Sequence, residues 1–142
     1  MCGRGKVADV RRMLLVVCVL VAGCPSEPPP ACKMIDTTCS PGYVPTFPNV
    51  YENTIKGSCG TDDSSCHSAS GRAGGLSMAT MNEAYANLLS LDLVKAGDPS
   101  CSEMIVRTDS PGKDYQMPPG DALSPEERCA LIQWVQMGAM NP

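Results

Sequence analysis

Cys59-Gly-Thr-Asp-Asp-Ser-Ser-Cys66-His67 is the most informative stretch of this 142-residue chain. Two thiols, the second followed directly by an imidazole, form the group that attaches a c-type haem. The thiols add across the haem vinyl groups and the imidazole ligates the iron. The usual spacing is Cys-x-x-Cys-His, whereas six residues separate these two cysteines. The stretch therefore predicts haem c on Cys59 and Cys66 with His67 as proximal ligand, on condition that Gly60 to Ser65 bulge outward.

Two other chemistries fit the same three residues. Cys59 and Cys66 could form a disulfide, because the six-residue insert suits a disulfide loop without strain. A zinc site on Cys59, Cys66 and His67 is a further alternative, although no fourth ligand is evident and exported thiols tend to oxidise. His67 is the only histidine. No Ser-His-acid grouping is therefore signalled, and we do not expect an enzyme.

Residues 1–23 have the features of an export signal. A basic start is followed by a short apolar run, Met13 to Val21, which ends in Val21-Ala22-Gly23-Cys24. The run is too short for a stable membrane span. Export also suits a chain with nine cysteines, because disulfides persist in oxidising compartments.

The end of this segment resembles the lipobox of bacterial lipoproteins. The resemblance implies that Cys24 is acylated, becomes the first mature residue and anchors the protein to a membrane. Ser26 lies close by and no aspartate follows Cys24, which by the same resemblance implies sorting to the outer membrane or another periplasmic face of the envelope. An ordinary signal peptide cut at a nearby small residue is the alternative.

The mature chain is acidic. Without residues 1–23, seven basic and fourteen acidic residues remain, a net charge of about −7. Nucleic acid is therefore not an expected partner, because nucleic-acid binding relies on clustered Lys and Arg. The acidic residues are scattered rather than blocked, which is typical of a solubilising surface.

A proline-rich tether and four further cysteines frame the domain. Residues 24–31 read Cys-Pro-Ser-Glu-Pro-Pro-Pro-Ala, which favours extended polyproline geometry over a helix. Cys32 and Cys39 follow, and Cys101 and Cys129 lie much further along the chain. Six cysteines allow 15 connectivities. We pair Cys32 with Cys39 in a small loop and Cys101 with Cys129, with proximity in the sequence as the only basis.

Capping signals and apolar spacing predict helices. A short helix is expected near Pro48, with Phe47, Val50, Tyr51 and Ile55 on one side. Thr80-Met-Asn-Glu83 predicts the start of a second helix, and Ser124-Pro-Glu-Glu127 that of the last. A brief helical segment is expected over residues 101–107. Residues 108–123 are rich in helix breakers and contain Met117.

Taken together, these residues resemble the cytochrome c-like domains of exported bacterial proteins. The resemblance spans roughly residues 48–140 and rests on motifs that occur in a shared order. These are Cys66-His67, Gly74-Gly75-Leu76, Ala84-Tyr85-Ala86-Asn87-Leu88, Gly97-Asp98-Pro99, Met117-Pro118-Pro119-Gly120, Leu123-Ser124-Pro125-Glu126-Glu127, Ile132-Gln133-Trp134-Val135 and Gly138-Ala139. The resemblance implies an all-α fold, one haem c, and Met117 as the distal iron ligand.

The chemistry of Met117 agrees with that role, because a thioether is a soft neutral ligand and a His/Met pair raises the reduction potential. Packing of Met117 into the domain without contact to iron is the alternative. The organisation that follows is a lipoprotein signal peptide at 1–23, a tether at 24–47 and a cytochrome c-like domain at 48–142. We expect a lipid-anchored monohaem electron carrier with a redox protein as partner. The alternative is a haem-free interaction module of the same fold, stabilised by disulfides.

Overall fold

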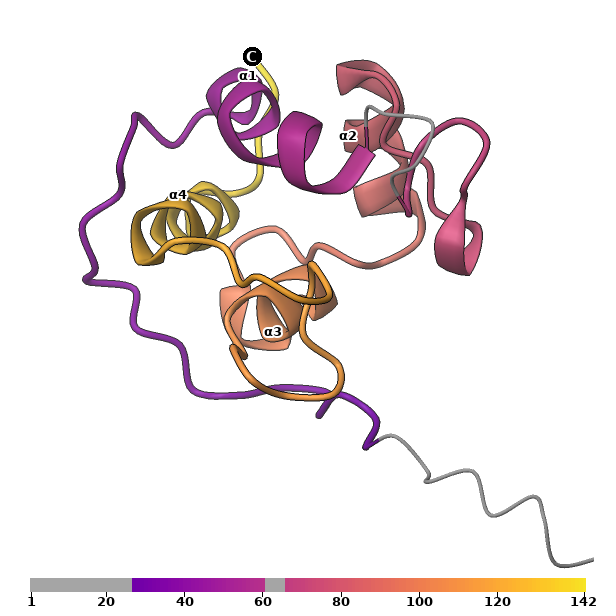
Figure 1. Cartoon of the computed structure of the whole chain (residues 1–142). Helices are drawn as coiled ribbons and strands as arrows, with labels where there is room; N and C mark the ends of the chain where they lie inside the picture. Colours follow the sequence, from indigo (N-terminus) through magenta and orange to yellow (C-terminus); the bar gives the residue numbers. More distant parts are fainter. Residues whose placement is uncertain (1–26, 61–65) are drawn as a thin grey trace, which may run out of the picture.

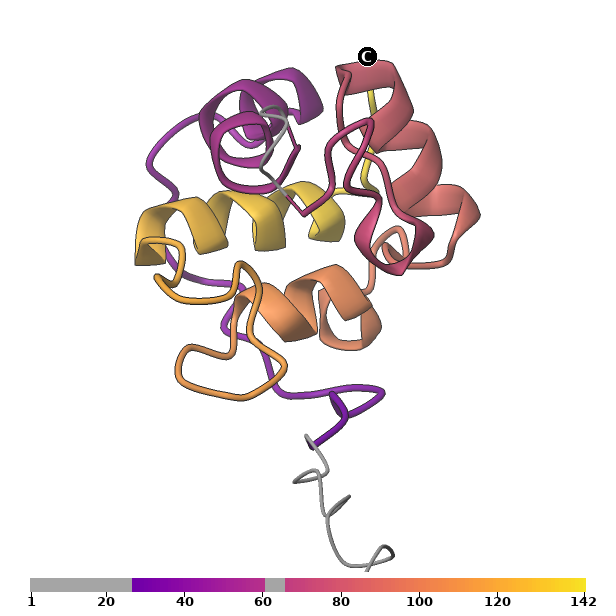
Figure 2. The same ribbon diagram turned by 45° about the vertical axis from the view of Figure 1, so that its right-hand side comes forward.

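The computed structural model describes residues 27–60 and 66–142, and within these ranges the fold is all-α with no strand. This confirms the predicted fold class. These described residues form four α-helices and three other helical segments, which pack around one core (Figures 1 and 2). In chain order they are α1 (Phe47–Val50), η2 (Tyr51–Gly60), η3 (Ala73–Gly75), α2 (Met81–Ser90), η4 (Pro99–Cys101), α3 (Glu103–Thr108) and α4 (Pro125–Gln136).

Helices α2 and α4 begin where their capping residues predict. The Thr80 hydroxyl accepts a hydrogen bond from the Glu83 amide at 3.2 Å at the start of α2. At the start of α4 the capping box is complete, because the Ser124 amide also donates to the Glu127 carboxylate at 2.9 Å. Each cap satisfies backbone donors that a helix start leaves without an intrahelical partner. These local bonds explain why both helix starts could be predicted from the sequence.

The centre of the core lies between α1 and α4. Phe47 and Trp134 have their ring centroids 5.0 Å apart, and both side chains are almost fully buried. Tyr85 of α2 approaches Phe47 at the same distance. The Trp134 indole donates to the carbonyl of Met140 at 3.0 Å, so its one polar atom is satisfied.

The short helix expected near Pro48 is present, and it is longer than expected. Helix α1 continues directly into η2, a π-helix of ten residues, and Phe47, Val50, Tyr51 and Ile55 are all buried. The apolar spacing found this element but not its π form, which is rare and concentrated at functional sites. Its last residues are Cys59 and Gly60, so the end of η2 positions the first thiol of the Cys59–His67 stretch.

Residues 32–46 form a strap, an irregular segment fastened along the outside of the helices (Figure 1). The Lys33 amide donates to the carbonyl of Ser100 at 2.9 Å, and the Gln133 side chain donates to the carbonyl of Cys39 at 2.7 Å. The Lys33 ammonium pairs with the Asp109 carboxylate at 3.0 Å. The strap is thus tied to both η4 and α4.

The disulfides correct the predicted pairing. All four cysteines expected in disulfides are bonded, but Cys32 pairs with Cys101 and Cys39 with Cys129. Proximity in the sequence was misleading because Cys32 and Cys39 lie on an irregular segment without helix, and seven extended residues can span roughly 20 Å. Each cysteine therefore meets the element beneath it rather than its neighbour in the sequence. There is no separate small loop at residues 32–39.

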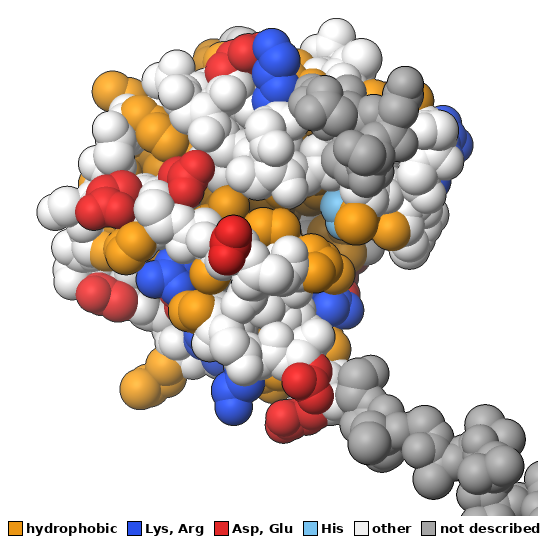
Figure 3. Space-filling view, in the orientation of Figure 1, with side chains coloured by type: hydrophobic (Ala, Val, Ile, Leu, Met, Phe, Trp, Pro, Cys, Tyr) orange, Lys and Arg blue, Asp and Glu red, His pale blue; other side chains and the backbone are white. Residues whose placement is uncertain are grey.

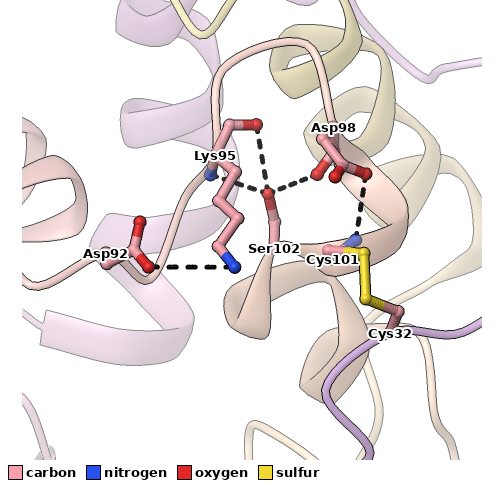
Figure 4. The surroundings of a disulfide bond; sticks show 6 residues. All are labelled: Cys32, Asp92, Lys95, Asp98, Cys101 and Ser102. Carbon is pink, nitrogen blue, oxygen red and sulfur yellow. Dashed lines mark hydrogen bonds and ion pairs between the residues drawn. A yellow bond between two sulfur atoms is a disulfide. The ribbon is translucent and has the colours of Figure 1, made fainter.

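Figure 4 shows how the turn before Cys101 is built. The buried Ser102 hydroxyl accepts from the Lys95 amide at 2.8 Å and donates to the carbonyl of Asp98 at 2.7 Å. The Asp98 carboxylate accepts from the Cys101 amide at 3.1 Å. These bonds fix η4 and present Cys101 to the strap at the point where α3 begins.

No helix within residues 27–60 and 66–142 is long and apolar enough to cross a membrane. The signal segment 1–23 and Cys24 lie outside the described residues, as do residues 61–65 of the insert between Cys59 and Cys66.

Candidate functional site: a thiol, imidazole and thioether cavity

A cavity of about 440 Å³ opens between the Cys66–Leu76 loop and α3. This is within the usual range for small-molecule and cofactor sites. Figure 3 shows the hollow with the histidine side chain at its edge and apolar side chains around it. The lining residues are Ser58, Cys59, Cys66, His67, Ala73, Gly74, Leu76, Met78, Leu88, Leu93, Glu103, Met104, Arg107, Thr108, Met117, Pro118 and Pro119. The four residues that the sequence singled out for haem, Cys59, Cys66, His67 and Met117, therefore share one cavity.

Backbone hydrogen bonds close the expanded Cys59–His67 stretch. The His67 amide donates to the carbonyl of Cys59 at 3.1 Å, which brings the two ends of the stretch together. The Ala73 amide donates to the carbonyl of Cys66, and the Met78 amide to that of His67, both at 2.7 Å. The longer spacing therefore does not separate Cys59 from His67.

The His67 ring is oriented by the loop that follows it. Its Nδ1 lies 3.4 Å from the carbonyl oxygen of Leu76. A carbonyl can only accept, so this contact places the ring proton on Nδ1 and leaves the lone pair on Nε2. Metal-ligating histidines are commonly held in this way, by a backbone carbonyl on the other ring nitrogen.

The two cavity cysteines are free thiols in different environments. Cys66 is exposed, whereas Cys59 is largely covered at the end of η2. Burial raises the pKa of the Cys59 thiol to about 11, and the negative charge of Glu127 adds to that shift. Since the thiolate is the form that attacks disulfides and alkylating agents, we expect Cys59 to react slowly at neutral pH in the folded chain.

Met117 lines the cavity from the loop that follows α3. Its amide donates to the carbonyl of Arg107 at 3.2 Å, which ties the loop to the end of α3. In both ribbon views α3 and this loop lie on one side and the Cys66–Leu76 loop on the other (Figures 1 and 2). The loops that carry His67 and Met117 therefore lie on different sides of the cavity that both residues line.

Gln116 holds the Met117 loop in shape. This buried side chain accepts from the Gly112 amide at 2.7 Å and donates to the carbonyls of Pro118 and Gly120 at 2.8 and 3.0 Å. Three bonds from one amide satisfy backbone groups that lie on both sides of Met117. We did not single out Gln116 from the sequence, because nothing in a lone glutamine signals such a network.

Sequence reasoning also missed the α3 wall of the cavity. Glu103, Met104, Arg107 and Thr108 all line it. Glu103 and Arg107 are four residues apart, as are Met104 and Thr108, so each pair lies on adjacent turns of the same side of the helix. That spacing was a usable signal, but α3 has only six residues, too few for a clear periodic pattern. Met78 and Met104 also line the cavity, so Met117 is not its only thioether.

The donor set fits a haem c. Cys59 and Cys66 offer two thiols for the vinyl groups, and His67 and Met117 offer one nitrogen and one sulfur for the iron. The remaining lining is mostly apolar, as a porphyrin face requires. Within the described residues, no three His, Cys, Asp or Glu side chains are grouped to hold a metal ion. The zinc alternative on Cys59, Cys66 and His67 receives no support from this arrangement.

Comparison with known proteins points in the same direction. No curated protein and no solved structure matches the chain significantly. Residues 64–121 match the family model described as planctomycete cytochrome C. The matched stretch begins just before Cys66-His67 and ends just after the Met117 loop, so it contains three of the four candidate haem residues. The match supports a cytochrome c-like domain in this chain.

Proposed function

We propose that this protein is a lipid-anchored monohaem electron carrier of the c type. The observation that supports it best is the single cavity that two thiols, one imidazole and one thioether share. Cys59 and Cys66 would hold the haem covalently, His67 would ligate the iron from one wall, and Met117 from the other. The expected partner is a redox protein.

Each of these residues has a distinct task. The carbonyl of Leu76 keeps the proton on Nδ1 of His67, so that Nε2 can ligate. Gln116 keeps Met117 in place, and apolar side chains such as Leu76, Leu88 and Leu93 limit the access of water. When bound, the haem supplies a one-electron iron couple, whose potential a His/Met pair raises relative to two histidines.

The expanded spacing is compatible with this task. Since the His67 amide is bonded to the carbonyl of Cys59, the insert begins and ends at the same point of the cavity rim. Cys59 and Cys66 are also free, while the other four cysteines of the described chain are paired. The closed loop is compatible with either reading, and the free thiols favour haem attachment over the haem-free alternative, in which they form a disulfide.

The test is maturation of the full chain beside a cytochrome c maturation system. We expect an intact-mass gain of one haem and a reduced pyridine spectrum of the c type. Cys66→Ala should lose the covalent haem, whereas Ser70→Ala, an exposed neighbour that does not line the cavity, should keep it. Colourless wild-type protein with a Cys59–Cys66 disulfide would contradict the proposal and support the haem-free module.

The lipid anchor has a separate test. Labelling with a clickable fatty acid in a Gram-negative host should mark the wild type and not Cys24→Ala. Equal labelling of both proteins would contradict acylation of Cys24, but it would not contradict the proposed electron-carrier function.

A further inference from the structure

The cavity contains one ion pair in an otherwise mostly apolar lining. Among the described residues that line it, Arg107 is the only Lys or Arg and Glu103 the only Asp or Glu. Both lie on the same face of α3, four residues apart, and Arg107 Nε lies 2.7 Å from a Glu103 carboxylate oxygen. The pair therefore places one cation beside a mostly apolar lining, where a ligand with an apolar body and a carboxylate end would contact both.

The contacts of Arg107 leave one edge of the guanidinium open. Nε donates to Glu103, and one Nη lies 3.4 Å from the carbonyl of Tyr115. The other Nη makes no hydrogen bond to a described residue. A guanidinium has five N–H donors in a fixed planar fork, and the edge formed by its two Nη atoms matches a carboxylate. Glu103 and Tyr115 hold this edge in place, so little further ordering is needed on binding.

We propose that Arg107 binds a carboxylate of the porphyrin, namely a haem propionate. This inference rests on the proposed function, because it assigns a residue to one end of the same ligand. Glu103 orients the guanidinium through Nε, and the Nη edge faces the propionate. The charged end of the ligand then meets the one cation of the lining, while its apolar body meets Leu76, Leu88, Leu93 and Pro118. Arg107 thereby fixes which end of the haem lies against α3.

The test compares two porphyrins that differ only at this end. The mature chain, with Cys59→Ser and Cys66→Ser so that binding stays reversible, is titrated with ferric haem and with its dimethyl ester. Arg107 is then changed to Gln or Lys. Lys113→Gln is the matched control, because it removes one exposed cation from the next loop and does not line the cavity.

We expect Arg107→Gln to weaken the binding of ferric haem roughly tenfold to hundredfold, the range of a charge-assisted hydrogen bond. Binding of the dimethyl ester should be the same in both proteins, Arg107→Lys should recover part of the loss, and Lys113→Gln should change nothing. Equal weakening of acid and ester, or no weakening of either, would overturn this inference alone. Failure of the parent chain to bind either porphyrin would contradict the proposed function as well.

Discussion

The helical framework (α1, η2 and α4) and the cavity loops (residues 66–80 and 109–123) are held in place by different forces. In the framework, Phe47 and Trp134 are buried against each other and Cys39–Cys129 fastens the strap to α4. In the cavity loops, His67 and Met117 depend on a few hydrogen bonds, such as those of Leu76 and Gln116. The framework therefore sets the stability of the domain, and the loops set the positions of the proposed ligating atoms.

The largest effect is expected from the disulfides of the framework. Loss of Cys39–Cys129 as the double Ala variant should lower the free energy of unfolding by about 4 kcal/mol, because the bridge closes a loop of sequence separation 90. Denaturant unfolding of oxidised wild type and variant measures the difference. A change below about 1 kcal/mol would show that this bridge does not hold the framework together.

The disulfide pairing can be determined by peptide mapping of the unreduced protein. Trypsin cuts after Lys33, Lys56, Lys95, Arg107 and Arg128, so each of the four cysteines falls in its own peptide. We expect Cys32 linked to Cys101 and Cys39 linked to Cys129. A peptide pair that joins Cys32 to Cys39 would contradict the placement of the strap.

The next effect concerns Cys59, where the framework meets the cavity. Burial raises its pKa from 9.0 to about 11, so at pH 8 its alkylation should be about a hundredfold slower in the folded apoprotein than in the unfolded chain. The unfolded thiol loses its proton first as pH rises. Burial of the protonated Cys59 thiol therefore contributes fully to stability below pH 9, and this contribution is lost as the pH rises from 9 to about 11.

Peptide mapping after timed alkylation measures the protection of Cys59, with the exposed Cys66 as the internal comparison. In Cys59→Ala, the free energy of unfolding should fall less between pH 9 and 11 than in the wild type. Alkylation of Cys59 as fast as that of Cys66 at pH 8 would show that η2 does not bury this thiol.

The smallest effect tests the junction of η2 with the cavity loop. A Cβ at Gly60 would lie 2.5 Å from the carbonyl oxygen of Met78, so the backbone of one of the two residues would have to shift. Gly60→Ala should therefore lower the free energy of unfolding by about 2 kcal/mol. Gly57→Ala in the same helical segment meets nothing within 4 Å and should be neutral or slightly stabilising. Equal stabilities of the two variants would contradict the close approach of Gly60 to Met78.

The same division explains what the sequence could predict. Helices α2 and α4 were predictable because Thr80 and Ser124 cap them through bonds to residues three positions away. The disulfide partners were not, because they depend on where the strap crosses η4 and α4. Met117 was identified through its place in a motif, whereas Arg107 and Gln116 act through contacts made only in the folded chain.

The most direct test of the account is which methionine ligates the iron. Met78, Met104 and Met117 all line the cavity, so each is changed to Leu in the haem-loaded protein. The measurement is the thioether-to-iron charge-transfer band of the ferric protein, together with its reduction potential. We predict that Met117→Leu loses the band and has a lower potential, while Met78→Leu and Met104→Leu keep both. A band that survives in Met117→Leu and disappears in either of the other two variants would contradict the account.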